Sequence, residues 1–110
     1  TIVNKNFKEL PNFAFKNLDI KERINFMDLS KNQIETIEVQ AFENVFNLND
    51  LILSKNRLTF LKNYTFSALN ILKNLDLSSN YLYKIDTNAF FNLSSLNNLD
   101  LSENQIGYLK

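Results

Sequence analysis

Apolar residues recur along this chain with a period of 24 residues. Stretches of similar composition begin, 24 residues apart, at Phe26, Asp50, Asn74 and Asn98. We number each unit from its first apolar residue, which is in turn Ile24, Leu48, Leu72 and Leu96. Positions 4, 6, 11 and 14 then carry Leu, Ile or Met, position 9 is always Asn, and position 19 is Phe in the first three units. A fixed period of this length predicts stacked units that share one continuous core.

Positions 4 and 6 predict a short strand in every unit, because side chains two residues apart point to the same side. Successive copies of this strand can lie side by side as a parallel sheet. Beyond the strand the apolar spacing widens, which indicates a turn. The asparagine at position 9 has donors and an acceptor that can satisfy buried backbone groups of its own turn and the next. We therefore expect an asparagine ladder of Asn32, Asn56, Asn80 and Asn104.

The pattern L-x-x-L-x-L-x-x-N-x-L-x-x-L-x-x-x-x-F-x-x-L resembles the leucine-rich repeat. Its length of 24 residues, with Phe at position 19, is similar to the typical class of extracellular receptors, such as Toll-like receptor ectodomains and small proteoglycans. The resemblance implies an α/β-type solenoid with a curved parallel β-sheet on the concave face and irregular or short helical return segments. It covers residues 24–110, which we divide into units 24–47, 48–71, 72–95 and an incomplete unit 96–110.

The start of the chain does not follow the repeat, and we expect a cap-like segment over residues 1–23. Within it, NFKELP is similar to the segment before the first repeat in extracellular members of the family, where a short strand covers the open end. Such caps usually carry paired cysteines, and this chain has none. The fourth unit is not followed by a polar closing segment. We expect this end to meet further repeats, a cap or a partner, or to self-associate.

Composition argues against several classes of function. The 110 residues include no Cys, no His and one Gly, which removes thiolate metal sites, the usual general base and a glycine-rich phosphate loop. Twelve basic residues balance twelve acidic ones, so no excess charge favours nucleic acid or an anionic membrane. No apolar run reaches the length of a membrane span. We expect no enzyme activity, cofactor, metal, nucleic acid or membrane span in this chain.

Residues between the buried positions of each strand face outward on the concave side, at positions 3, 5 and 7, and positions 8 and 10 lie on the adjoining edge. Positions at which the units differ can carry specificity for a protein partner. These candidates are Phe26, Lys31, Asp50, Ile52, Lys55, Arg57, Asn74 and Tyr81. Phe26 and Ile52 are the expected apolar anchors. Lys31, Lys55 and Arg57 form a basic stripe that favours an acidic patch on the partner. The alternative is that these are ordinary solvated positions.

A catalytic or calcium-binding reading of the concave face rests on Asp76 and Asp100. Neighbouring strands lie about 4.8 Å apart, close to the carboxylate separation of a retaining glycosidase. Against this reading, Asp-Leu-Ser is the triplet that the repeat usually carries at these positions. The expected surface is also open, with no pocket to raise a pKa. We therefore favour a framework role for these carboxylates.

Two sequons make Asn63 and Asn92 candidate glycosylation sites. The chain has 19 Asn and 13 Ser or Thr, so chance alone supplies about two sequons and they do not indicate secretion. Asn63, on the return side, is the better candidate, because Asn92 adjoins the apolar Leu93 of the core pattern.

Together these features favour a non-catalytic protein-recognition module. By resemblance it forms the N-terminal repeats of an extracellular receptor or adhesion protein, outside the cell or at its surface. The alternative function is a structural scaffold segment packed within a larger assembly. The lack of Cys is typical of cytosolic proteins, so a cytoplasmic location is the alternative to an extracellular one.

Overall fold

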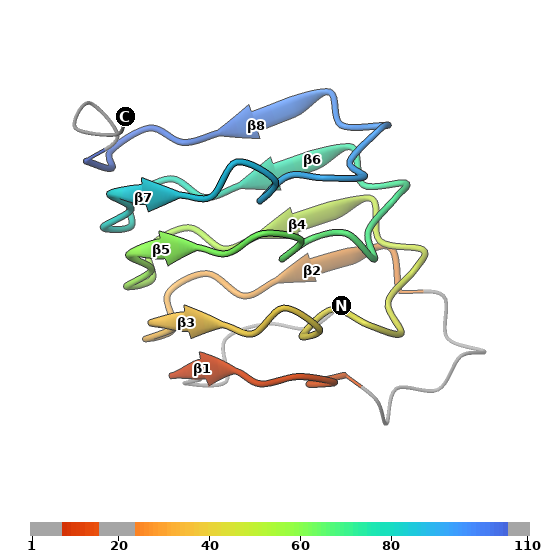
Figure 1. Cartoon of the computed structure of the whole chain (residues 1–110), viewed down its shortest axis with the longest axis horizontal. Helices are drawn as coiled ribbons and strands as arrows, with labels where there is room; N and C mark the ends of the chain where they lie inside the picture. The colour runs from red at the N-terminus through yellow and green to blue at the C-terminus, as the bar shows by residue number, and fades with distance from the viewer. Residues whose placement is uncertain (1–7, 16–23, 106–110) are drawn as a thin grey trace.

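The computed structural model describes residues 8–15 and 24–105, which form a solenoid of stacked turns (Figure 1). One side of the stack is a parallel sheet of four three-residue strands in the order β2-β4-β6-β8. Their bounds are Phe26–Asp28 (β2), Asp50–Ile52 (β4), Asn74–Asp76 (β6) and Asn98–Asp100 (β8). The register advances by one repeat at each step, so that Phe26 pairs with Asp50 and Asp50 with Asn74. The expected leucine-rich repeat solenoid is confirmed.

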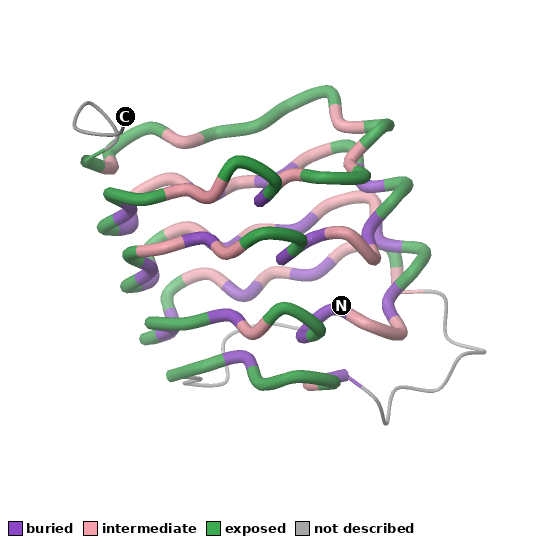
Figure 2. Tube along the Cα trace, in the orientation of Figure 1, coloured by how far each residue is buried: buried purple, intermediate pink, exposed green. Residues whose placement is uncertain are grey.

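The alternation of buried and half-exposed residues in these strands follows from their two-residue side-chain period. Met27, Leu51 and Leu75 at the strand centres are buried, whereas the residues on either side are half-exposed. Figure 2 shows buried segments along these three turns, whereas all three residues of β8 are exposed. One face of the sheet therefore closes the core, and the other face, called the concave face below, is presented outward.

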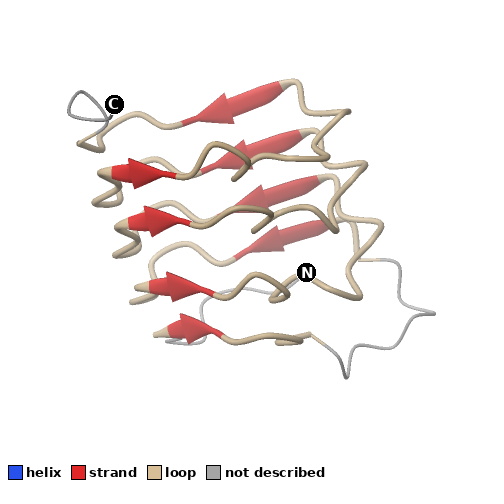
Figure 3. Ribbon diagram, viewed as in Figure 1, coloured by secondary structure: helices blue, strands red, loops and turns tan. Residues whose placement is uncertain are grey.

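The opposite side of the stack carries a feature that the sequence did not predict. Four strands of two residues each lie there: Glu9–Leu10 (β1), Thr36–Ile37 (β3), Phe60–Leu61 (β5) and Lys84–Ile85 (β7). They pair in parallel as β1-β3 and β5-β7. The rest of the return side consists of turns, and the described part of the chain contains no helix (Figure 3). Of the two expected forms of return segment, the irregular one is present.

The strand β1 places residues 8–15 beneath the first turn of the repeat. Backbone bonds hold this stretch there, with Glu35 N donating to Lys8 O at 2.7 Å and Glu38 N donating to Leu10 O at 2.8 Å. The remainder of the expected cap, residues 1–7 and 16–23, lies outside the described residues, as do residues 106–110 at the end of the fourth unit.

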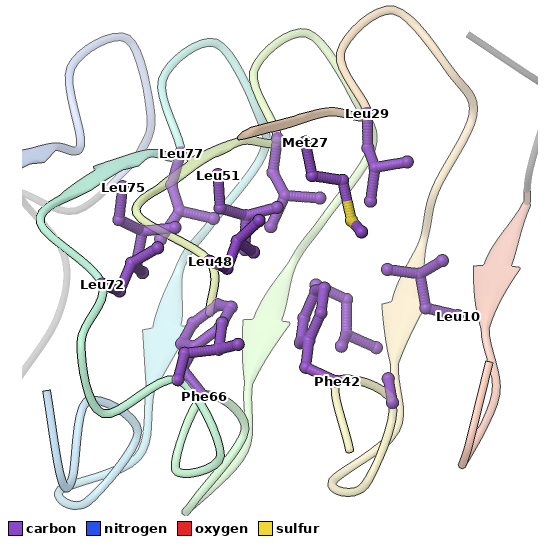
Figure 4. Close-up of a cluster of buried hydrophobic side chains, with 14 of the residues drawn as sticks. Leu10, Met27, Leu29, Phe42, Leu48, Leu51, Phe66, Leu72, Leu75 and Leu77 are labelled. Atoms are coloured by element: carbon purple, nitrogen blue, oxygen red, sulfur yellow. The ribbon is translucent and has the colours of Figure 1, made fainter. Parts of the chain in front are cut away.

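The core consists of aliphatic layers and one column of phenylalanines (Figure 4). Phe42, Phe66 and Phe90 at position 19 stack, with ring centroids 5.8 and 6.1 Å apart. Phe15 extends the column below the first turn, with its ring 5.9 Å from that of Phe42. Each unit thus covers the ring of the next, which is why a single unit cannot form a core by itself.

Position 8 bends the chain away from every strand of the large sheet. Lys31, Lys55, Ser79 and Glu103 all have φ between 55° and 58°. This left-handed conformation costs a residue with a Cβ roughly 1–2 kcal/mol. The same bend forms with three different residue types, so the side chain at position 8 does not determine it. The hydrogen bonds of the adjacent asparagine ladder offset its energetic cost.

Candidate partner-binding face

The asparagines at position 9 connect each turn to its neighbour. Asn56 Nδ2 donates to Leu29 O at 3.0 Å in the preceding turn and to Leu53 O at 2.9 Å in its own. Its Oδ1 accepts from Ile34 N at 3.1 Å. Asn80 and Asn104 make the equivalent bonds one and two turns later. Since these bonds fix the end of each strand, the concave face is held rigid from beneath.

The aspartates at position 5 cap the strands of the concave face. Asp76 Oδ1 accepts from the backbone N–H of Ser78 at 2.9 Å and from its hydroxyl at 2.6 Å. Asp28 and Asp100 form the same pair of bonds with the serine two residues later. The Asp-x-Ser motif is therefore a local structural unit of the turn. Only Ile52 in the second turn departs from it.

The pKa of Asp100 agrees with this framework role. The side-chain hydrogen bond from Ser102, followed by the backbone bond from the same residue, lowers the pKa of Asp100 below its ordinary value of 3.8. A general acid near neutral pH requires a raised pKa. This shift therefore argues against Asp76 and Asp100 as an acid–base pair.

The concave face contains a broadly open hollow of about 630 Å³, a feature that the expectation of an open surface without a pocket did not include. Four of the predicted partner-binding residues line it: Phe26, Asp50, Ile52 and Asn74. The hollow forms because the four strands of the sheet lie side by side around it, and no single repeat could indicate this. Its lining also includes residues that sequence reasoning had not selected for partner binding, namely Leu51, Leu75, Asp76, Asn97, Asn98, Leu99 and Asp100.

A side-chain ladder crosses the hollow at position 3. Asn74 Nδ2 donates to Asp50 Oδ1 at 2.5 Å, and Asn74 Oδ1 accepts from Asn98 Nδ2 at 2.6 Å. Asn74 is thus already paired on both sides rather than freely solvated. All charged residues that line the hollow are aspartates, so its electrostatic character is acidic.

The other four predicted residues do not line the hollow. Lys31, Lys55, Arg57 and Tyr81 are exposed and lie on the adjoining edge, at positions 8 and 10. The structure therefore separates the candidates into an acidic hollow and a largely basic edge. An acidic partner suits the edge and does not suit the hollow.

Sequence reasoning missed three residues beside that edge. Tyr83 is 53% exposed. In the pair β5-β7, Phe60 lies opposite Lys84, whose Nζ is 4.9 Å from the centre of the phenylalanine ring. The signal that could have identified them is the difference between units at positions 12 and 13, which were not compared.

Both sequon asparagines are exposed on the return side. Asn63 Oδ1 accepts from Asn88 N at 2.9 Å, and the hydroxyl of the buried Thr65 donates to Lys62 O at 2.7 Å. Asn92 Nδ2, the atom that would carry a glycan, instead donates to Ser67 O at 2.8 Å. Of the two sites, Asn63 has the less engaged amide nitrogen.

Neither a metal centre nor a membrane helix is found in the part of the chain that the structure describes. Within residues 8–15 and 24–105, no three or more carboxylate side chains gather closely enough to hold a metal ion. Over the same residues, no helix is long and apolar enough to cross a membrane.

The sequence pattern of the family described as leucine rich repeat matches residues 26–82 and 46–106, so the chain belongs to the leucine-rich repeat family. No curated protein sequence matches it. Its repeats are of the Toll-like receptor type, as the solved structures that it resembles show. It is 29% identical to TLR13 in a complex with ssRNA13, with a TM-score of 0.74 over 89% of this chain. It is 33% identical to Toll in the Toll–Spatzle complex of Drosophila, with a TM-score of 0.79 over 88% of this chain.

A glycosylated form of the Toll–Spatzle complex gives the same identity and TM-score. The chain spans 17% of the TLR13 chain and 12% of the Toll chain in the first Toll complex, a small part of either receptor. The comparisons establish a repeat module of the kind that takes part in molecular recognition.

Proposed function

We propose that this chain is a non-catalytic recognition segment of an extracellular receptor or adhesion protein, and that a protein ligand binds across the concave face. The observation that carries this proposal is the hollow, in which the half-exposed apolar side chains of Phe26 and Ile52 stand among hydrogen-bonded polar groups. Apolar anchors within a polar surround are the composition of protein-binding sites. The rigid sheet beneath them reduces the ordering cost of binding.

One of the two similar receptors supports the kind of ligand that we propose. Toll is in a complex with the protein Spatzle, and TLR13 is in a complex with a single-stranded RNA. The second complex means that the likeness does not support our expectation that nucleic acid is excluded. The hollow itself favours a protein, because its charged lining consists of Asp50, Asp76 and Asp100, which would repel a polyanion.

The experiment that tests this proposal compares two variants of the hollow with one control variant outside it. The chain is secreted from eukaryotic cells behind an added signal peptide and tested by biolayer interferometry against a panel of extracellular proteins. Phe26→Ala and Ile52→Ala should weaken binding to the identified protein by about tenfold or more, as expected for anchors. Phe46→Ala is the matched control, because Phe46 is a 52% exposed phenylalanine that does not line the hollow.

Two results would count against the proposal. Loss of binding in Phe46→Ala, with both concave variants unaffected, would move the ligand to the return side. A chain that binds no extracellular protein but associates with cytoplasmic ones would favour the scaffold alternative.

A further inference from the structure

A second exposed surface lies outside the hollow, where the chain turns from the large sheet toward the short strands. We define this lateral surface by Lys55, Arg57, Phe60, Tyr81, Tyr83 and Lys84. It extends over two neighbouring turns: Arg57 and Tyr81 share position 10, and Phe60 and Lys84 are paired in β5-β7. Backbone bonds join the two turns, with Tyr81 N donating to Leu58 O at 2.8 Å and Tyr83 N to Thr59 O at 3.0 Å. None of its residues lines the concave hollow.

The two tyrosines of the lateral surface are exposed to solvent. Tyr81 is 54% exposed and Tyr83 is 53% exposed, while the apolar Leu82 between them is fully buried. The backbone therefore holds both rings on the outside, one residue on either side of a core anchor. Tyrosine and arginine are the residue types enriched at energetically important positions of interfaces.

The cations of the lateral surface are not neutralised by the described part of the chain. The ion pair of the described residues, Lys62 with Glu38, lies elsewhere, and none is formed by Lys55, Arg57 or Lys84. Lys84 instead lies over the ring of Phe60. Such a contact orients the ammonium group and leaves its charge available to an anion. Three cations and three aromatic rings thus lie together without a carboxylate partner.

We propose that the lateral surface is a second docking site, which takes an acidic segment of a protein partner with apolar side chains among its carboxylates. Arg57 would bind a carboxylate in bidentate geometry, with Lys55 and Lys84 adding positive charge beside it. Tyr81 and Tyr83 would receive the apolar side chains. Charge complementarity therefore assigns opposite chemistry to the two surfaces, since the hollow is acidic and the lateral surface is basic.

The extent of the positive charge favours a short protein segment over a nucleic acid strand. Position 12 of the preceding turn is Glu35, and position 8 of the following turn is Glu103. Both are exposed, and Glu103 accepts a hydrogen bond from the Ser79 hydroxyl at 2.7 Å. A polyanion that followed the stack would meet Glu35 in the preceding turn, which also carries Lys31, and Glu103 in the following turn, whereas a short acidic segment would stay within the two central turns.

The test titrates the chain with three probes at low ionic strength and follows the backbone amides by NMR. The probes are a short peptide of alternating glutamate and leucine, its counterpart with lysine in place of glutamate, and an oligouridylate of similar length. The glutamate peptide should bind and should shift the amides of residues 55–60 and 81–85. Arg57→Glu should weaken its binding about tenfold or more, as loss of an interface arginine does, and Tyr83→Ala should weaken it severalfold.

The matched control is Lys73→Glu, which makes the same reversal of charge at an exposed residue outside the lateral surface. It should change the affinity less than twofold, and all variants should keep the thermal midpoint of the parent chain because these side chains are exposed. The proposal is overturned by no binding of the glutamate peptide, by equal binding of the lysine peptide, or by tighter binding of the oligouridylate. Equal losses in Lys73→Glu and Arg57→Glu would also overturn it. Because the hollow variants Phe26→Ala and Ile52→Ala leave this surface intact, its failure is distinguishable from failure of the concave site.

Discussion

The asparagine ladder predicts a large loss of stability when Asn80 is replaced by alanine. Asn80 is 5% exposed, and its amide makes four hydrogen bonds. Three of these reach carbonyl oxygens that retain another donor in the variant. Leu53 O keeps Asn56 Nδ2 at 2.9 Å, Leu77 O keeps Asn104 Nδ2 at 3.0 Å, and Ser78 O keeps the Lys55 N–H at 3.1 Å.

The fourth hydrogen bond makes the largest contribution to the loss in the free energy of unfolding. The Leu58 N–H donates to Asn80 Oδ1 at 3.1 Å, and Leu58 is fully buried. A buried donor left without an acceptor costs about 1–3 kcal/mol, and the weaker satisfaction of the three carbonyls adds to it. We expect a total loss of about 2–4 kcal/mol in the free energy of unfolding, a large part of what a chain of this size has. The thermal midpoint should then fall by about 8–20 °C.

Circular dichroism and hydrogen exchange together test this reasoning. Thermal unfolding measures the overall loss, and native-state exchange of the Leu58 amide tests its assigned cause. The matched control is Asn70→Ala, an exposed asparagine in the preceding repeat unit, for which we expect a change of about 0.5 kcal/mol or less. Equal midpoints for the two variants, or a Leu58 amide that keeps its protection in Asn80→Ala, would refute the ladder as the source of stability.

Two further predictions concern the core and the turns. Phe66→Ala removes the ring between Phe42 and Phe90 and should cost about 3–5 kcal/mol, measured by denaturant unfolding, because the cavity interrupts the column. Ser102→Ala removes the side-chain bond that is the larger cause of the lowered pKa of Asp100, so an NMR titration should show that pKa rising toward 3.8. Since a lowered folded-state pKa adds stability above the unfolded value and loses it as pH falls through the folded value, the variant should differ most from the parent above pH 3.8.

The fold could be predicted because the 24-residue period puts the same residue type into the same environment at every turn. Met27, Leu51 and Leu75 could be placed in the core from their spacing alone, and the sheet register followed from it. The short strands of the return side could not be predicted. A strand of two residues is too short to show a period, and Phe60–Leu61 and Lys84–Ile85 pair only because stacking brings neighbouring turns together.

The site was predictable only in part, because some of its features form between stacked units and not within one. Variation between units pointed to Phe26 and Ile52, which line the hollow, but it could not show that a hollow exists. The hollow and the cation–ring contact of Lys84 with Phe60 arise between units rather than within one. Residues 24 apart become neighbours in the solenoid, so their side-chain chemistry must be compared across turns.

The position-3 ladder leads to a prediction about pH. Asn74 Nδ2 lies 2.5 Å from Asp50 Oδ1. Asn74→Asp keeps the shape of the side chain but places a second carboxylate oxygen in contact with that of Asp50. Two adjacent carboxylates cannot both ionise easily, so the pKa of the carboxyl introduced at position 74 should rise above its unfolded value of about 3.9.

A folded-state pKa raised in this way gives stability that is fully present below the unfolded pKa and is lost as pH rises through the folded value. The thermal midpoint of Asn74→Asp should therefore be near that of the parent chain at about pH 3.5 and should fall progressively behind it toward pH 7. High salt should reduce the gap only partly, because the site is half-exposed and the two groups are in contact. Asn97→Asp is the control for an added charge on the same face, since Asn97 is exposed and lines the hollow but lies outside the position-3 ladder. A gap between Asn74→Asp and the parent that stays constant with pH would show that the two side chains do not contact each other in solution, and the ladder across the hollow would have to be abandoned.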